Sequence, residues 1–372
     1  MNLQKFELER YFAQHEFNAP YLLSCSDCEP LSLQEVLSLA DDSSLHMWED
    51  LSLGYTESQG HPVLREEISR LYPGIVKGDL VVLAPEEGIF IAMNSILQEG
   101  DHVVTTFPGY QSLYEIARSL GCEVSRWTPR ESEGWTFRIG DLQEAVRKDT
   151  KLLVVNFPHN PTGATLSTKE FKEIIEISDR RGITLFSDEM YRLLEYDEAD
   201  RLPSAATLSE NAVSLSGLSK SFSLAGLRIG WLATENSELL DSFVTFKGYT
   251  TICNSAPSEV LAIIALRSRG RILDRNLDII NRNLKRVDKF FSKYQNVFTW
   301  HPPQAGPVAF PKLTTDVDVL DFCSDLINKQ GVLLVPSEVM NYEGNNFRVG
   351  FGRADTVESL ERLEEYVKEK IL

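Results

Sequence analysis

The sequence predicts an α/β fold: a large domain built on a mostly parallel sheet, with helices on both faces, joined to a small α+β domain. From roughly residue 80, short β-branched runs alternate with stretches of helical period. The strand-like runs are apolar almost throughout, which is typical of parallel strands buried on both faces. After Thr251 the pattern changes to a long helical stretch and then short alternating segments. This change predicts a second, smaller unit.

The large domain should contain successive strand and helix pairs. Its best-marked helix covers residues 167–182, because Ser167 and Glu170 have the spacing of a capping box and Gly182 can end the helix. The expected strands are "GDLVVLA" (78–84), "DHVVTTF" (101–107), "CEVSRW" (122–127), "KLLVVNF" (151–157) and "ITLFSDE" (183–189), with helices over 88–100 and 110–121 between the first three.

The small domain should be attached through a long helix. Residues 258–294 have a helical pattern that is interrupted near Gly270, and residues 356–372 form a final amphipathic helix. Between them, "VLLVPSEVM" and "NFRVGFGR" alternate like strands. We therefore predict an N-terminal arm (1–45) that joins the small domain, a large domain (46–255), and a connecting helix with the small C-terminal domain (256–372).

The composition is that of a soluble globular protein, with 42% hydrophobic and 25% charged residues. The net charge of −18, without a compensating basic run, argues against nucleic acid and anionic membrane surfaces as partners. The sequence has no apolar run of about eighteen residues that could span a membrane, and its start lacks an apolar signal-peptide core. Five cysteines favour free thiols in a reducing cytoplasm. Cys25 and Cys28 have metal-type spacing, but without a second pair or nearby histidines we expect no metal site.

Four polar side chains follow predicted strands: Tyr110, Asn160, Asp188 and Lys220. Ligands of open parallel sheets bind beyond the carboxyl ends of the strands, where these residues should meet. Each alone has an ordinary explanation, such as a turn at Asn160, a helix cap at Asp188 or a surface position for Lys220. Their common placement predicts a functional site.

Three segments carry a family resemblance: "NFPHNPTG" (156–163), "SDEMY" (187–191) and "SGLSKSFSLAGLRIGW" (216–231). In this order they resemble the signature of the fold-type I pyridoxal-phosphate enzymes, aminotransferase class I/II. The similarity runs from Glu29-Pro30 through "GYTESQGHPVLREEI" (54–68) to "FRVGFGR" near the end. It implies a homodimer that binds pyridoxal 5′-phosphate.

The resemblance also implies roles around the cofactor ring. Lys220 would form the Schiff base with the cofactor aldehyde and then move protons, for which burial and a neighbouring cation must lower its pKa. Asp188 would keep the pyridine nitrogen protonated. Asn160 and Tyr191 would donate hydrogen bonds to the phenolic oxygen, and Tyr110 would stack on the ring.

The phosphate site should depart from that of relatives. Arg228 and Ser219 occupy the family's phosphate-binding positions, and a helix N-terminus should add backbone N–H groups. That helix begins "APEEGIF" where relatives carry a glycine- and threonine-rich turn. Pro85 has no N–H to donate, and Glu86 and Glu87 bring carboxylates toward a dianion. Their side chains must turn away, or one must serve another purpose such as meeting a cationic substrate.

The remaining implied positions concern substrate and partner subunit. Arg348 matches the arginine that holds the substrate α-carboxylate, whereas Arg353 should form an ordinary salt bridge. Cys28 replaces a glycine of the family's "GEP" and should reshape the substrate pocket. Tyr55 matches a tyrosine that reaches the phosphate of the neighbouring subunit; the alternative is a tyrosine in the core.

The function that the resemblance implies is transfer of the α-amino group of an amino acid to a 2-oxo acid, with Lys220, Asp188 and Tyr191 as catalytic residues. A second hypothesis keeps the cofactor but changes the reaction to β- or γ-elimination, replacement or cyclisation, as in capreomycidine-synthase-like enzymes. A third, a cofactor-binding regulator fused to a DNA-binding module, is disfavoured by the acidic charge and the absence of a spare basic helix. Which amino acid and which oxo acid react is not encoded in these motifs.

Overall fold

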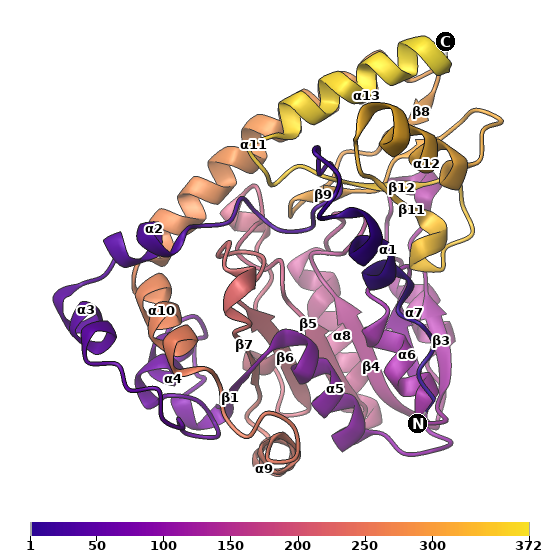
Figure 1. Ribbon diagram of the computed structural model, residues 1–372. Helices are drawn as coiled ribbons and strands as arrows, with labels where there is room; N and C mark the ends of the chain where they lie inside the picture. Colours follow the sequence, from indigo (N-terminus) through magenta and orange to yellow (C-terminus); the bar gives the residue numbers. More distant parts are fainter. Residues whose placement is uncertain (1, 372) are drawn as a thin grey trace.

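The centre of the protein is a seven-stranded sheet in the order β1-β7-β6-β5-β4-β2-β3, as seen in a computed structural model that describes residues 2–371 (Figure 1). Strands β2 to β6 run parallel to one another, and only β7 runs antiparallel, pairing with β6 and β1. The predicted mostly parallel α/β sheet is therefore confirmed. The strands are β1 (Leu80–Leu83), β2 (His102–Thr106), β3 (Glu123–Trp127), β4 (Thr150–Asn156), β5 (Thr184–Asp188), β6 (Ala212–Gly217) and β7 (Gly230–Ala233).

Helices cover both faces of this sheet because successive strand residues point to opposite sides. In β4, Leu152 and Val154 pack with one apolar cluster, whereas Leu153 and Val155 pack with another. This two-sided burial explains why the strands are apolar throughout. One face is covered by α5 (Pro85–Ile96), α6 (Ser112–Ser119) and α9 (Ser237–Lys247), and the other by α4 (Pro62–Ser69), α7 (Ile139–Ala145), α8 (Thr168–Arg181) and α10 (Ala256–Arg267).

Local signals placed two helix boundaries correctly. The Ser167 side chain and Glu170 form the predicted capping box at the start of α8, and Gly182 ends the helix with φ 62°. The predicted interruption in the long C-terminal helix is also present, two residues earlier than expected. It falls at Ser268, which separates α10 from α11 (Arg269–Lys293).

A separate apolar cluster gathers the C-terminal elements with part of the N-terminal segment. Its small sheet has the order β11-β12-β9 and is antiparallel, and β8 pairs antiparallel with β10. Leu23 and Cys28 of the N-terminal segment belong to this cluster. The elements are α12 (Val319–Gln330), α13 (Thr356–Lys370), β8 (Phe298–Thr299), β9 (Val308–Ala309), β10 (Lys312–Leu313), β11 (Val335–Pro336) and β12 (Phe347–Gly350).

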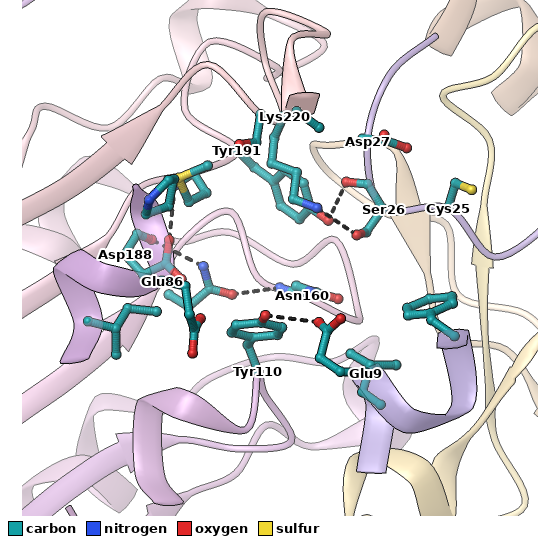
Figure 2. A pocket seen from close by; sticks show the side chains of 18 of the residues that line it. Glu9, Cys25, Ser26, Asp27, Glu86, Tyr110, Asn160, Asp188, Tyr191 and Lys220 are labelled. Carbon is teal, nitrogen blue, oxygen red and sulfur yellow. Dashed lines mark hydrogen bonds between the residues drawn. The ribbon is translucent and has the colours of Figure 1, made fainter. Parts of the chain in front are cut away.

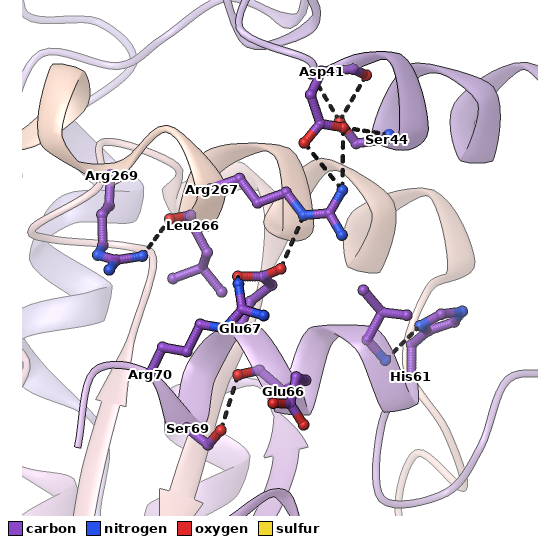
Figure 3. Close-up of polar contacts among 11 residues, drawn as sticks. Asp41, Ser44, His61, Glu66, Glu67, Ser69, Arg70, Leu266, Arg267 and Arg269 are labelled. Carbon is purple, nitrogen blue, oxygen red and sulfur yellow. Dashed lines mark hydrogen bonds and ion pairs between the residues drawn. The ribbon is translucent and has the colours of Figure 1, made fainter. Parts of the chain in front are cut away.

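The N-terminal segment carries α1 (Glu7–His15), α2 (Leu33–Ser38) and α3 (Asp42–Glu49). An ion-pair network fastens its far end to the large sheet (Figure 3). Arg267 of α10 contacts both Asp41, the N-cap of α3, at 3.1 Å and Glu67 of α4 at 2.9 Å. Glu67 is buried, and Arg70 binds its other oxygen at 2.8 Å. Two cations thus offset the desolvation of one carboxylate.

The start of the N-terminal segment bridges the two parts of the molecule. The backbone N–H of Glu7 donates to Gln111 Oε1 at 3.0 Å, while the Tyr11 hydroxyl donates to the carbonyl of Leu334 at 2.8 Å. Helix α1 therefore lies between the sheet edge and the small sheet (Figure 1). Within residues 2–371, no helix is both long enough and apolar enough to cross a bilayer.

Gly350, the last residue of β12, lets the N-terminal segment run directly beside that strand. Its N–H donates to the carbonyl of Leu23 at 3.0 Å. A Cβ at this position would stand 1.8 Å from the carbonyl oxygen of Cys25, which is backbone and cannot move alone. The close approach fixes the stretch from Leu23 to Cys25.

We predict that Gly350→Ala destabilises the protein by about 3 kcal/mol, because the added methyl overpacks a rigid backbone contact. Gly140→Ala is the matched control: Gly140 lies in α7 with no atom within 4 Å of the added methyl, so a gain of about 0.5–1 kcal/mol is expected. Urea unfolding followed by circular dichroism measures both. Equal stabilities of Gly350→Ala and the natural protein would contradict the prediction.

Candidate active site

A cavity of about 600 Å³ lies at the carboxyl ends of β4, β5 and β6, beneath α1 (Figure 2). It is lined by the predicted residues Tyr110, Asn160, Asp188, Tyr191, Ser219, Lys220, Arg228 and Arg348, and also by Glu86. These side chains come from positions more than 200 residues apart, and the parallel sheet brings most of them to one edge.

Lys220 follows β6 by three residues and points into the cavity. Its Nζ donates a hydrogen bond to Ser26 Oγ at 2.9 Å. Burial lowers the pKa of Lys220 and Arg348 lowers it further, while Asp27 acts in the opposite direction. A lowered pKa increases the neutral, nucleophilic fraction of this amine near neutral pH.

Asp188 is the last residue of β5 and is buried. Its Oδ1 accepts from the N–H of Met190 at 3.1 Å. Burial raises the pKa of Asp188 to about 7, against the effect of that hydrogen bond and of Lys220. A cationic or N–H-bearing ligand beside it would favour the ionised form.

Asn156 organises the floor of the cavity and was missed by the sequence reasoning. Its Nδ2 donates to the carbonyl of Asp188 at 3.1 Å, and its Oδ1 accepts from the N–H of Asn160 at 2.8 Å. The available signal was its position as the last residue of β4 and the first of the "NFPHNPTG" motif.

Arg348, in β12, is the buried cation of the site, with no exposed surface. Its Nη2 donates to the carbonyl of Ser24 at 3.0 Å and its Nη1 to Asn160 Oδ1 at 3.2 Å, whereas its Nε has no hydrogen-bond partner among residues 2–371. Burial lowers the pKa of Arg348. Neither acceptor is a carboxylate, so the guanidinium retains capacity for an anionic ligand. The Tyr191 hydroxyl donates to the carbonyl of Ser26 at 2.9 Å nearby.

The start of α5 forms another wall, with Ser219 and Arg228 close to it in the cavity lining. The Ser219 hydroxyl is buried and has no partner within the described chain. Arg228 has φ 55° and donates to the carbonyl of Ala225 at 3.0 Å. Helix N-termini with free N–H groups and a cation bind anions, so this wall can hold a phosphate.

Glu86 and Glu87, both in the first turn of α5, have different environments. Glu86 faces the cavity and accepts from the Ser112 hydroxyl, and burial raises its pKa. Glu87 does not line the cavity; its Oε1 accepts from the hydroxyls of Thr250 at 2.5 Å and Thr251 at 2.8 Å. Glu87 therefore turns away from the cavity, whereas Glu86 faces it, which leaves for Glu86 the expected alternative of another purpose.

Two further predicted residues lie outside the cavity lining. Cys28 is fully buried in the apolar cluster of the small sheet, because the segment passes into that cluster after Asp27. The residues of this segment that line the cavity are Cys25, Ser26 and Asp27 instead. Tyr55 is 90% exposed, which rules out the alternative of a core tyrosine.

Helix α1 supplies a lid that the sequence did not reveal. Its residues Leu8, Glu9 and Phe12 line the cavity, followed by Glu16 just beyond the helix. Nothing in the local sequence connects this helix to Lys220, since their contact depends on tertiary structure.

Arg353 forms the predicted salt bridge, to Asp27 at 2.9 Å. No cluster of three or more metal-ligating side chains occurs within residues 2–371.

The family can now be stated from comparison with known proteins. The pattern described as "Aminotransferase class I and II" matches residues 35–365. The chain belongs to this family. The match covers the sheet, the Lys220 segment and Arg348.

Similar proteins differ in their printed activities. Capreomycidine synthase of Streptomyces vinaceus is 28% identical over 92% of this chain and 88% of that protein. An aspartate aminotransferase of Pyrococcus horikoshii is 27% identical over 83% of this chain and 82% of that protein. The crystal structure of a PLP-dependent aminotransferase from Streptococcus suis superposes with a TM-score of 0.92 at 29% identity, covering 99% of this chain and 98% of the other. The fold is thus that of fold-type I enzymes, while the reaction differs among relatives.

The raised pKa of Asp188 predicts how stability varies with pH in the ligand-free protein. The folded chain holds this proton more tightly than the unfolded chain, whose carboxyl titrates near 3.9, so Asp188 reduces stability as pH rises from about 4 to about 7. Asp188→Asn removes this cost. Relative to the natural protein, the variant should gain about 2 kcal/mol more at pH 8 than at pH 5.

Urea unfolding of both proteins at the two pH values tests this prediction. Asp179→Asn, an exposed carboxylate at the end of α8, is the control and should change stability equally at both. The same difference between Asp188→Asn and the natural protein at pH 5 and pH 8 would refute a buried, proton-holding Asp188.

Proposed function

We propose that this protein is a pyridoxal-phosphate-dependent aminotransferase that passes the α-amino group of an amino acid to a 2-oxo acid. The observation that carries the proposal is one cavity that combines Lys220, with its lowered pKa, the buried carboxylate of Asp188 and the buried guanidinium of Arg348. Membership of the aminotransferase class I and II family supports it.

The lining residues fit the cofactor apart from Glu86, a carboxyl at the phosphate wall whose pKa is raised by burial toward the neutral form. The buried Ser219 hydroxyl without a partner, with Arg228 and the N-terminus of α5, suits the phosphate. Asp188 suits a protonated ring nitrogen, which would give its buried carboxylate a partner. Asn160 would donate to the phenolic oxygen, and Tyr110 would lie against the ring. Tyr191 would also donate to that oxygen by redirecting its single hydroxyl hydrogen from the Ser26 carbonyl. When bound, pyridoxal phosphate withdraws electrons from the substrate Cα and so weakens the Cα–H bond.

The chain's own groups then divide the work. Arg348 binds the substrate α-carboxylate through N–H groups that a buried, planar guanidinium holds in place. Lys220 Nζ accepts the proton from the substrate Cα. In the return half of the transfer it delivers a proton to Cα of the amino acid formed from the 2-oxo acid. Proton abstraction requires the neutral amine that burial favours. Ser26 fixes the position of that amine, since its hydroxyl accepts from Nζ. Helix α1 limits the access of water.

A second candidate function is elimination or cyclisation of an amino acid at the same site. The 28% identity to capreomycidine synthase over 92% of the chain favours it. Lys220, Asp188 and Arg348 would have the same roles up to removal of the Cα proton. Product analysis separates the candidates: a 2-oxo acid together with amination of an added oxo acid supports transfer, whereas ammonia release or a cyclised amino acid without that amination supports the second function.

We predict that Lys220→Ala abolishes covalent attachment of pyridoxal phosphate and lowers turnover at least about 10³-fold, because both nucleophile and base are lost. Borohydride reduction followed by peptide mass spectrometry should locate the cofactor on Lys220 in the natural protein. Lys172→Ala, an exposed position on α8, is the control and should keep attachment. Attachment that persists in Lys220→Ala would overturn the assignment.

We further infer a homodimer in which Tyr55 reaches the partner's phosphate. The support is the exposure of apolar side chains around this position: Tyr55 is 90%, Tyr249 87% and Leu53 81% exposed. Burying such surface is a main source of dimer stability. The separate apolar cluster of the C-terminal elements supports a small C-terminal domain. The proposed boundaries at residues 45 and 255 need shifting, because Val36 and α10 pack with the large sheet. The five free thiols fit a cytoplasmic enzyme.

Subunit mixing tests the shared site. Tyr55→Ala and Lys220→Ala should each be weakly active alone. Co-refolded in equal amounts, they should regain roughly a quarter of the natural activity per chain, because each heterodimer has one site with both residues intact. The control is the natural protein, with Tyr55 and Lys220 intact in both chains, refolded in the same way. Failure of mixed samples to exceed the separate variants, although mass spectrometry detects heterodimers, would contradict a shared site.

A further inference from the structure

The cavity has an acidic wall opposite its cations. Glu9 of α1 and Glu16 just after it line the cavity, and Asp27 lies beside them. Figure 2 shows Glu9 across the cavity from Lys220, next to Tyr110, whose hydroxyl donates to Glu9 at 3.0 Å. We name Glu9 and Glu16 the acidic wall.

Neither carboxylate of the acidic wall is neutralised by the protein. Among residues 2–371, no Lys, Arg or His nitrogen lies within salt-bridge distance of Glu9 or Glu16, whereas Asp27 is paired with Arg353 at 2.9 Å. Burial raises the pKa of Glu16 and Asp27 raises it further, while Arg353 and Lys220, which lie beyond salt-bridge distance, act in the opposite direction. Glu16 is half-buried and Glu9 is exposed at the rim of the cavity, so both carboxylates are accessible to a cationic group that enters it.

A second observation shows where the other end of a ligand binds. Arg348 is fully buried, lines the same cavity, and keeps an Nε without a partner in the described chain. Arg348 and the acidic wall therefore present opposite charges to one ligand. The free amine of Lys220 does not satisfy the wall, since its Nζ donates to Ser26, and its charge would be lost on covalent attachment of the cofactor.

We propose that the substrate is an α-amino acid whose side chain ends in a cation, a guanidinium or an ammonium, held by Glu9 and Glu16 while Arg348 holds the α-carboxylate. This inference rests on the proposed function, whose site it completes. It also disfavours dicarboxylic amino acids, because a second carboxylate would face the acidic wall, and like charges brought together are repelled.

The natural holoenzyme should distinguish arginine from citrulline, which has nearly the same shape but no charge. We expect kcat/KM, or the concentration that half-shifts the cofactor absorbance, to favour arginine at least 10-fold. Lysine against norleucine repeats the comparison for an ammonium, and aspartate should be the weakest ligand. A preference for arginine alone or for lysine alone would identify which cation is taken, and either supports the proposal.

Two variants assign the preference to the wall. Glu9→Gln and Glu16→Gln should each reduce the arginine-to-citrulline ratio by about 10-fold. Glu7→Gln is the matched control, since Glu7 is an exposed glutamate of the same helix that does not line the cavity. Glu16→Lys should improve binding of aspartate, a gain that misfolding cannot produce.

The outcomes separate this inference from the proposed function. If neutral amino acids shift the absorbance and are converted but arginine and lysine have no advantage, the acidic wall does not select substrate and the proposed function stands. If no amino acid of the panel shifts the absorbance of the holoenzyme, both fail. An arginine preference that survives both glutamine variants also overturns the assignment to Glu9 and Glu16.

Discussion

The site depends on one constraint: residues 24–27 are held between β12 and the edge of the large sheet. Gly350 allows the backbone contact with Cys25 that fixes this stretch. From it, the Ser24 carbonyl accepts from Arg348, the Ser26 carbonyl accepts from Tyr191, and the Ser26 hydroxyl accepts from Lys220. Buried N–H and O–H groups need such acceptors. Without this stretch, the cations of the cavity would be desolvated and unsupported, and their directions would not be defined.

Burial then gives the site its chemistry. The same desolvation that raises the pKa of Asp188 lowers that of Lys220, because in each case the charged form is disfavoured. An amine whose pKa is lowered and a carboxyl whose pKa is raised are both poised to change state when a ligand brings a compensating charge. The sheet positions Asp188 rigidly at the end of β5, whereas Lys220 lies in a loop after β6. Such an arrangement suits a fixed electrostatic partner and a movable amine.

The walls of the cavity differ in origin. The wall formed by α5, Ser219 and Arg228 belongs to the large sheet and can hold an anion. The opposite wall comes from α1, which is anchored to Gln111 on one side and Leu334 on the other. Because α1 contacts both parts of the molecule, it holds Glu9 at the cavity lining. The relatives that share the fold but differ in reaction are consistent with specificity that resides in such attached elements rather than in the sheet.

The sequence alone determined the fold class and the strand ends, because these depend on local patterns such as apolar runs and a capping box. Its short motifs, through their family resemblance, also selected Lys220, Asp188 and Arg348, which line one cavity. It also located the departure at Glu86 and Glu87, but not their opposite directions, which packing against Ser112 and Thr250 decides. Only the tertiary structure showed that Cys28 turns into the core, that Ser26 meets Lys220 across 194 positions of sequence, and that α1 closes the cavity with unpaired carboxylates. Contacts of such separation have no local signal, since they arise when independently formed elements pack together.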